Sequence, residues 1–343
     1  MKKWILVAAV AMGLPMAAWA FQAGVIAPMT TGKVPSFGVQ LSGGTLNGEA
    51  KEHVYDYETV DGSRRQLSRL DWDLKDVAMG GINASLRPLV MVKGIDLSDG
   101  LTLNTVNGVT LNFGYWAALT EGSGEMDDYD WMDTGSEDWT HYSLSEVDVT
   151  DGYLFDVNVA WDFIRWKDVL TGRLFAGYKQ NGWTWEDRGQ YLLYPEYGYV
   201  PQALDGENMI NYEQKFRMPY LGAGLDATFP IKPVELTISG RLTYSPSVEA
   251  TDWDDHLERE IHFKEEFKGG DMVGLGLDVR CAFTQGPLDG VFVALAVDVQ
   301  RIDLIVGDME YYDASTNEYG GDEDVAGIEN EYVAVSFGVG YQF

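Results

Sequence analysis

The sequence predicts an all-β fold, a single-chain antiparallel transmembrane β-barrel of about ten strands. Three observations lead to this prediction: an export signal at the start, an alternating C-terminal strand that ends in Phe343, and the lack of a long apolar run after the signal. Aromatic residues make up 13% of the 343 residues, and glycine occurs 39 times. This composition agrees with a barrel, because outer-membrane barrels carry aromatic girdles.

The first twenty residues have the pattern of a secretory signal peptide. Two lysines precede the apolar run 4–12, and the small residues Ala18 and Ala20 offer a cleavage site. A buried core helix is the alternative, but charges confined to the start and an Ala-Trp-Ala end favour export. We therefore expect residues 1–20 to be removed, which leaves one domain over residues 21–343 outside the cytoplasm.

The C-terminal stretch alternates between apolar residues and small or polar ones up to the last aromatic. The apolar positions are Val333, Val335, Phe337, Val339, Tyr341 and Phe343. A period of two predicts a strand with one apolar face. Such a strand could also close a soluble sandwich, but with export it is typical of the last strand of a bacterial outer-membrane barrel. Nothing after the signal reaches the roughly 18 apolar residues of a spanning helix.

Alternating segments separated by turn-rich or acidic stretches predict the barrel strands. They are 36–57, 64–86, 108–121, 149–166, 170–187, 212–229, 234–250, 260–284, 291–308 and 329–343. An even count is what bacterial barrels require. Many of these segments exceed the roughly 9–11 residues that cross a bilayer, so we expect the barrel to project above the outer membrane.

The connections between these segments are of two kinds. Short turns, expected at the periplasmic end, are 166–168, 231–233 and 285–290. Longer acid-rich connections, expected on the exterior, are 122–148, 188–211, 251–259 and 309–328. The stretch 87–107 stands where a periplasmic turn is expected, and we predict a small hairpin or plug-like elaboration there.

The chain is strongly acidic. Its formal net charge is −30, and removal of residues 1–20 with their two lysines leaves 22 − 54 = −32 for residues 21–343. Nucleic acid is therefore not expected as a partner. Part of this charge is solvated surface, but a lipid-facing band cannot carry it, so acids must gather in the loops and the lumen. Cationic peptides or proteins are the partners that such places attract.

Two acidic motifs could carry chemistry. In the stretch 126–133, Asp128 and Asp130 alternate and would share one face of an extended chain. Two close carboxylates can share a proton and hold a water, although a solvated loop or a calcium site draws on the same residue types. Asp254 and His256 are also two apart, and a carboxylate can orient an imidazole base. A His beside an Asp on a surface loop is the alternative interpretation.

Other catalytic classes find no support. The sequence lacks a Gly-x-Ser-x-Gly elbow, and the single cysteine, Cys281, lies inside an expected strand near the periplasmic rim. It also lacks a His-Glu-x-x-His motif or a His/Cys cluster, so we expect no metal and no bound cofactor. Water activated by carboxylates and a histidine remains.

The whole expected mature chain resembles the omptin family of outer-membrane proteases. The matching stretches are 44–48, 51–55, 68–72, Met126 with 128–133, 176–178, 214–220, 252–256 and 326–330. The resemblance implies an endopeptidase at the outer mouth of a monomeric barrel. In it His256 is the general base, Asp254 is its partner, and Asp128 with Asp130 forms the opposite couple that positions the water.

The resemblance also implies an acidic recognition pocket and therefore cleavage after Arg or Lys. It assigns the pocket to Glu52 and Asp252, with Met126 and Ile210 lining it, and a guanidinium pairs best with carboxylates in a partly dry site. The stretch 139–146 departs from the family's pattern, which leaves the preference beyond the cut bond open.

A second departure concerns lipid. The family's lipopolysaccharide-binding belt is retained at Tyr178, whereas Gln180 and Gly182 replace charged residues and Lys215 replaces an Arg. Lys215 and Lys268 can still meet phosphates, so we expect lipopolysaccharide to activate the protein with a reduced dependence.

Alternative functions remain open from the sequence. A catalytically silent surface adhesin or structural barrel would keep the acidic loops and lack cleavage. A general porin is disfavoured because about ten strands enclose too narrow a lumen, and a lipid-modifying enzyme because the acidic pocket would repel lipid phosphates. The physiological substrate and the aspartate that holds the shared proton also remain open.

Overall fold

A computed structural model describes residues 36–56, 64–88, 94–133, 136–204, 206 and 208–343. The predicted signal peptide lies outside these described residues. The long strands are β1 (Ser36–Asp56), β2 (Arg65–Arg87), β5 (Val109–Ala118), β6 (Gly122–Asp130), β7 (His141–Trp166), β8 (Leu170–Leu193), β10 (Ile210–Ile231), β11 (Val234–His256), β12 (Ile261–Phe283), β13 (Val291–Asp313) and β14 (Glu318–Gln342). The short elements are β3 (Ile95–Ser98), β4 (Leu101–Leu103), β9 (Gln202–Ala203) and the 3₁₀ turns Val106–Gly108, Pro195–Tyr197 and Gly286–Leu288.

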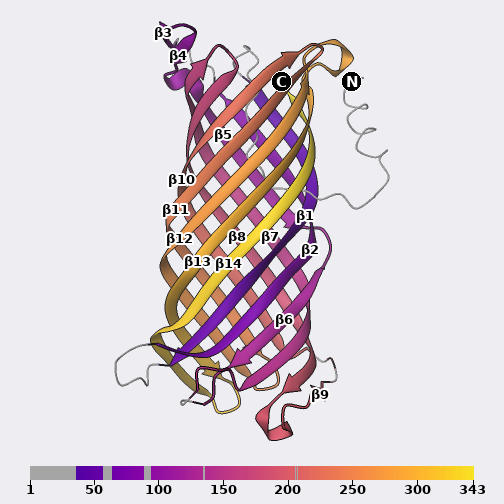
Figure 1. Cartoon of the computed structure of the whole chain (residues 1–343), viewed down its shortest axis with the longest axis vertical. Coiled ribbons are helices and arrows are strands. Elements are labelled where there is room, and N and C mark those ends of the chain that lie inside the picture. The colour runs from indigo at the N-terminus through magenta and orange to yellow at the C-terminus, as the bar shows by residue number, and fades with distance from the viewer. Residues whose placement is uncertain (1–35, 57–63, 89–93, 134–135, 205, 207) are drawn as a thin grey trace.

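The strands close into one antiparallel barrel (Figure 1). β1 pairs with β2 and β14, and the pairing of β7 with β8 completes the ring. β5 and β6 share one position, because both lie between β2 and β7. The ring then comprises β1, β2, β5 with β6, β7, β8 and β10 to β14, which is ten positions within the described residues. The predicted ten-stranded antiparallel barrel is confirmed.

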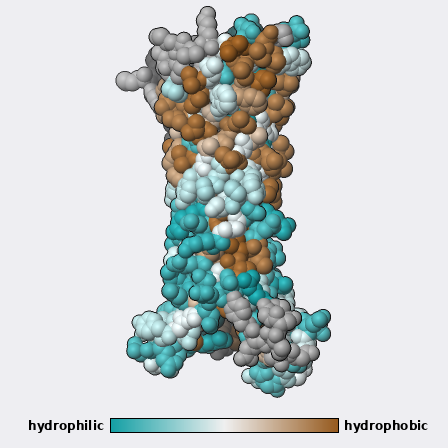
Figure 2. Space-filling model, turned by 90° about the vertical axis from the view of Figure 1, so that its left-hand side faces the viewer, coloured by the Kyte–Doolittle hydropathy of each residue, from teal (hydrophilic) through white to brown (hydrophobic). Residues whose placement is uncertain are grey.

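The outward face of each strand changes character along its length. On β12, Val273, Leu275, Leu277 and Val279 are exposed apolar residues, whereas the outward positions nearer the start of the strand are His262, Lys264, Glu266, Lys268 and Asp271. Figure 2 shows the result as an apolar band over the upper half and a hydrophilic lower half. A bilayer fits the first and water the second. Among the described residues, no helix is long and apolar enough to cross a membrane.

The strands are much longer than a bilayer requires. Most of the ring strands span 21 to 26 residues, against roughly 9–11 for a crossing strand. The barrel therefore projects well beyond the apolar band, as expected from the segment lengths. The short turns lie at the apolar end, together with the chain's C-terminus (Figure 1).

The predicted exterior loops were wrong in extent. Most of 122–148 belongs to β6 and β7, part of 188–211 to β8, β9 and β10, most of 251–259 to β11, and much of 309–328 to β13 and β14. The physical reason is that both faces of these strand ends are polar, because one faces water and the other a polar lumen. Apolar alternation then disappears while backbone pairing continues. The stretch 87–107 does contain a small hairpin, in which β3 pairs with β4 and β4 joins β7.

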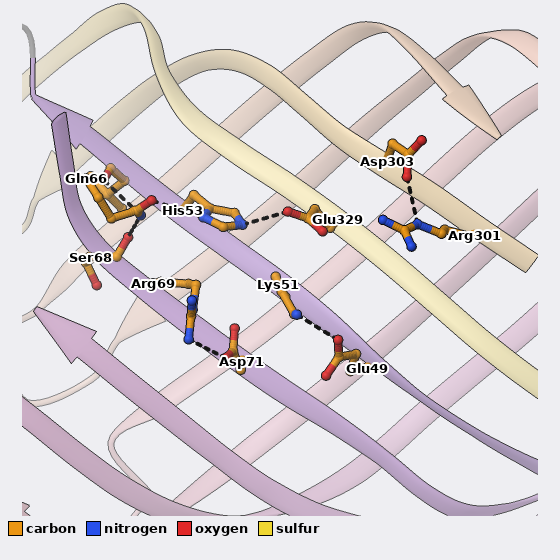
Figure 3. Close-up of polar contacts among 11 residues, drawn as sticks. Glu49, Lys51, His53, Gln66, Ser68, Arg69, Asp71, Arg301, Asp303 and Glu329 are labelled. Atoms are coloured by element: carbon orange, nitrogen blue, oxygen red, sulfur yellow. Dashed lines mark hydrogen bonds and ion pairs between the residues drawn. The ribbon is translucent and has the colours of Figure 1, made fainter. Parts of the chain in front are cut away.

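Ion pairs cover the water-facing outer wall around β1, β2, β13 and β14 (Figure 3). Lys51 contacts Glu49 at 2.7 Å, and His53 contacts Glu329 at 3.2 Å. Arg69 and Asp71 on β2 and Arg301 and Asp303 on β13 form similar pairs, at 3.0 and 2.7 Å. His53 is therefore committed to the outer wall, which removes it from the candidates for chemistry in the lumen.

Buried aromatic side chains pack together inside the barrel. The ring of Trp72 on β2 stacks on Tyr212 of β10 with centroids 4.8 Å apart, and Trp185 of β8 lies 5.6 Å from Tyr212. All three side chains are buried in the largest apolar cluster of the described chain. This packed cluster supports the residues at the polar end of the barrel.

Candidate active site

The two aspartates predicted to hold water lie side by side on one face of β6. Alternation along the strand turns Asp128 and Asp130 into the lumen, and pairing with β2 and β7 brings Ser68 and Ser143 beside them. Ser143 Oγ donates to Asp128 Oδ2 at 3.2 Å, and Ser68 Oγ donates to Oδ1 at 3.4 Å. The carboxylate of Asp128 is thus held from both sides by neighbouring strands.

The Asp–His pair lies at the end of β11 rather than on a loop. His256 Nε2 and Asp254 Oδ2 are 2.8 Å apart, and the imidazole meets the ring of Phe263 edge-on at 5.4 Å. Side-chain exposure is 19% for His256 and 4% for Asp254. The hydrogen bond fixes the orientation of the imidazole, while the residual exposure leaves it accessible from the lumen.

The two pairs influence each other electrostatically across the lumen. Burial lowers the pKa of His256, but the hydrogen bond and charge of Asp254 outweigh it, with a further contribution from Asp128, so the net pKa is raised. Burial and the neighbouring charge of Asp130 raise the pKa of Asp128 to about 7, and His256 opposes that rise. Burial likewise raises the pKa of Asp130. Near neutral pH the aspartate couple therefore retains a proton.

The predicted recognition residues gather next to these pairs. Glu52 of β1 and Asp252 of β11 are 2% and 0% exposed, and the charges of Asp252, Asp254 and Asp128 all act on Glu52. Tyr212 Oη donates to Asp252 Oδ2 at 3.0 Å. The result is a buried cluster of carboxyl groups, and burial raises the pKa of Glu52 and raises that of Asp252 to about 8.

The two apolar lining residues predicted with this pocket are also buried. Met126 lies on β6, two residues before Asp128, and is 1% exposed, while Ile210 begins β10 and is 8% exposed. Both belong to the central apolar cluster. Both are therefore apolar neighbours of the buried carboxyl groups.

The sequence interpretation missed two buried acids in this region. Asp187 of β8 accepts the backbone N–H groups of Met209 and Ile210 at 2.7 and 2.6 Å, and the Ser145 hydroxyl at 3.0 Å, which fixes the start of β10. Glu265 of β12 lies directly opposite Asp252 and is completely buried. Glu265 stands among charged neighbours in the sequence, so only the strand register reveals that it faces the lumen.

Of the remaining histidines, His141 borders the site beside Asp130, whereas His262 and the predicted lipid residues lie on the outer wall. His141 pairs in register with Asp130 and lies 3.6 Å from Glu196, while His262 contacts Asp255 on the outer face. Lys215 contacts Glu213 and the ring of Trp253, and Lys268 lies 3.8 Å from Glu266. Tyr178, whose ring is 6.4 Å from that of Phe155, sits with these lysines on the outward face of the barrel.

Comparison with known proteins identifies the family. The family model described as "Omptin family" matches residues 33–343. The chain belongs to the omptin family. This omptin is 30% identical over 312 residues to the plasminogen activator of Yersinia pestis, with 90% of each chain covered, and 28% identical to protease 7 of Escherichia coli K12, with 88% and 89% covered.

The solved structures agree on the fold. The crystal structure of outer membrane protease OmpT from Escherichia coli superposes with a TM-score of 0.75 at 23% identity, covering 94% of this omptin and 99% of that chain. The relatives include the outer membrane protease OmpP of Escherichia coli, at 27% identity over 89% of both chains. This omptin is accordingly an outer-membrane β-barrel of a protease family, in agreement with its apolar outer band.

Proposed function

We propose that this omptin is an endopeptidase that cleaves polypeptides after Arg or Lys at the cell surface, using a water activated between His256 and the Asp128/Asp130 couple. The observation that carries the proposal is a hydrogen-bonded Asp254–His256 pair whose charges interact with the carboxyl of Asp128, beside the buried carboxyls of Glu52 and Asp252. No other described part of the lumen combines a base, a water-binding couple and a cation site.

The geometry supports a simple sequence of steps. The Asp128/Asp130 couple holds the water, and His256 accepts a proton from it as the oxygen attacks the scissile carbonyl carbon. Asp254 orients the imidazole and stabilises its cationic form. When the C–N bond breaks, His256 returns that proton to the leaving amine. The mechanism therefore needs the neutral imidazole at the start and the charged one midway.

Specificity follows from the acidic pocket. Glu52 and Asp252 are buried beside the reacting groups, and a cationic side chain that enters gains charge-assisted hydrogen bonds in a site shielded from water. Met126 and Ile210 then cover the apolar stem. A Glu52→Gln variant that cleaves after Arg as well as the wild type would contradict this assignment.

We also propose lipopolysaccharide as an activating lipid, bound through Tyr178, Lys215 and Lys268. These residues lie on the outward face, and Lys215 and Lys268 lie where the wall changes from apolar to charged, where we would expect lipid phosphates. Both lysines also contact glutamates, which compete with lipid phosphates. This competition is consistent with a reduced dependence on the lipid.

The first experiment is cleavage of a quenched peptide containing Arg-Arg by refolded protein in lipopolysaccharide. We expect cleavage by the wild type and none by His256→Ala. This variant should fold, because the side chain that it removes is partly exposed. If neither protein cleaves, a catalytically silent adhesin or structural barrel becomes the better description.

A further inference from the structure

Glu265 occupies a position that the proposed mechanism does not use. It lies on β12 directly opposite Asp252 on β11, and its side chain is 0% exposed. Within the described residues, no N–H or O–H group donates to either of its carboxylate oxygens, although Asp252 lies close enough for the two carboxyl groups to share a proton. A buried carboxyl without a donor is costly to maintain, so a partner from outside the chain is the natural explanation.

The neighbours of Glu265 indicate the chemistry of that partner. Of the described buried atoms, Glu52 Oε2 and Asp252 Oδ1 also lack hydrogen-bond partners. Both side chains are close enough for their charges to act on Glu265. With the two oxygens of Glu265, this makes four carboxylate oxygens that receive no donor from the described residues, on three side chains from β1, β11 and β12, and the carboxyls of Glu265 and Asp252 lie within reach of each other. Only a cationic, donor-rich group satisfies such a set.

Asp252 is held in place from its other side. Gln214 Nε2 donates to Tyr212 Oη at 2.7 Å, and Tyr212 Oη donates to Asp252 Oδ2 at 3.0 Å. Tyr212 is itself stacked on Trp72. The chain thus supplies Asp252 Oδ2 with a donor of its own and leaves Oδ1 without one beside the carboxyl of Glu265, which is the arrangement of a preformed acceptor site.

We propose that Glu265 is a specificity-determining residue, the third carboxylate of the recognition pocket, and that it makes the pocket selective for arginine over lysine. This rests on the proposed function, because the ligand is the side chain before the cut bond. A guanidinium presents five donors in one plane and can bridge carboxylates on adjacent strands. An ammonium presents three donors at one point, so it gains less from a third acceptor.

The test uses three quenched peptides that differ only in Arg, Lys or citrulline before the cut bond. Glu265→Gln keeps the side-chain shape and removes the carboxyl group that would ionise when a cation binds. We expect kcat/KM for the Arg peptide to fall on the order of 10- to 100-fold, as for the loss of a hydrogen bond between charged groups. The fall should lie mainly in KM, the Lys peptide should lose less, and the preference for Arg over Lys should shrink accordingly.

Two further variants control the measurement. Glu310→Gln makes the same change on an exposed, outward-facing glutamate of β13 and should leave all three rates unchanged. Glu265→Asp keeps the charge but withdraws it by one methylene, and it should give intermediate selectivity. An Arg-to-Lys ratio in Glu265→Gln equal to that of the wild type would overturn the proposal while leaving the protease function intact.

A binding measurement separates the two hypotheses. Fluorescence polarisation of labelled Arg and Lys peptides on His256→Ala, with and without Glu265→Gln, reports recognition in the absence of chemistry. If the wild type cleaves no peptide, the protease function fails, but Glu265-dependent preference for the Arg peptide still supports the pocket. Equal affinities for the Arg and Lys peptides with and without Glu265→Gln would overturn the proposed role of Glu265.

Discussion

Replacing Asp254 by Asn tests the link between structure and pH dependence most sharply. Asp254 accepts from, or shares a proton with, His256 Nε2 at 2.8 Å in a site where Asp254 is 4% exposed. Its hydrogen bond and charge are what raise the pKa of His256 against the opposing effect of burial. Without the charge, burial prevails and the pKa must fall.

The magnitude follows from the strength of such a bond. A hydrogen bond between charged groups contributes about 1.5–3 kcal/mol, which at about 1.36 kcal/mol per pKa unit corresponds to roughly one to two units. A raised pKa means that the neutral base appears only at higher pH, so activity rises with pH through that pKa. In Asp254→Asn the acidic limb should move to lower pH by this amount, and its plateau should fall about 10²- to 10⁴-fold because the imidazolium loses its stabilising partner.

The assay measures kcat/KM for an Arg peptide from about pH 5 to about pH 9. This range extends to both sides of the ordinary histidine pKa of about 6.5. Asp128→Asn serves as the companion variant, because the pKa of Asp128 is raised to about 7 by burial and Asp130 and could also shape the profile. An acidic limb that stays in place or moves to higher pH in Asp254→Asn would refute the reasoning.

Three further outcomes are expected. Glu52→Gln should reduce kcat/KM for Arg peptides by roughly 10- to 100-fold, measured against a citrulline peptide. Burial raises the pKa of Glu265 in the folded protein well above its usual value. The folded protein is therefore destabilised as pH rises from the pKa of the unfolded chain through the pKa of the folded one. Glu265→Gln should therefore raise the melting temperature at pH 8, by roughly 2–4 °C for each 1 kcal/mol relieved, and not at pH 4. The double variant Lys215→Ala, Lys268→Ala should lose the increase in activity on addition of rough lipopolysaccharide. Wild-type activity that depends on this lipid as completely as in other omptins would contradict the reduced dependence.

The architecture was predictable because strands that face lipid on one side have apolar residues at alternate positions. The alternation up to Phe343 and the apolar segments of the membrane half come directly from the period of a strand with one lipid-facing side. The same rule fails for the projecting half. There β7 begins at His141, before the predicted residue 149, because apolar and polar residues are mixed on both faces of its first part and no apolar alternation marks the strand.

The candidate site was predictable in its spacing but not in its surroundings. Asp254 and His256 share a face whether the segment is a loop in extended form or a strand, so their pairing was predicted correctly from positions two apart. Glu265 was not predicted, since a glutamate next to Lys264 and Glu266 resembles surface charge. Its role depends on lying opposite Asp252, and that register is set by pairing along the whole of β11 and β12.

The most direct measurement of the central claim is mass spectrometry of the products released from a cationic peptide library by wild-type protein and by His256→Ala. We expect new C-termini at Arg, and less often at Lys, with the wild type alone. Products that are absent, that are equal for the two proteins, or that end at residues without positive charge would contradict the proposed water-activating site and its acidic pocket.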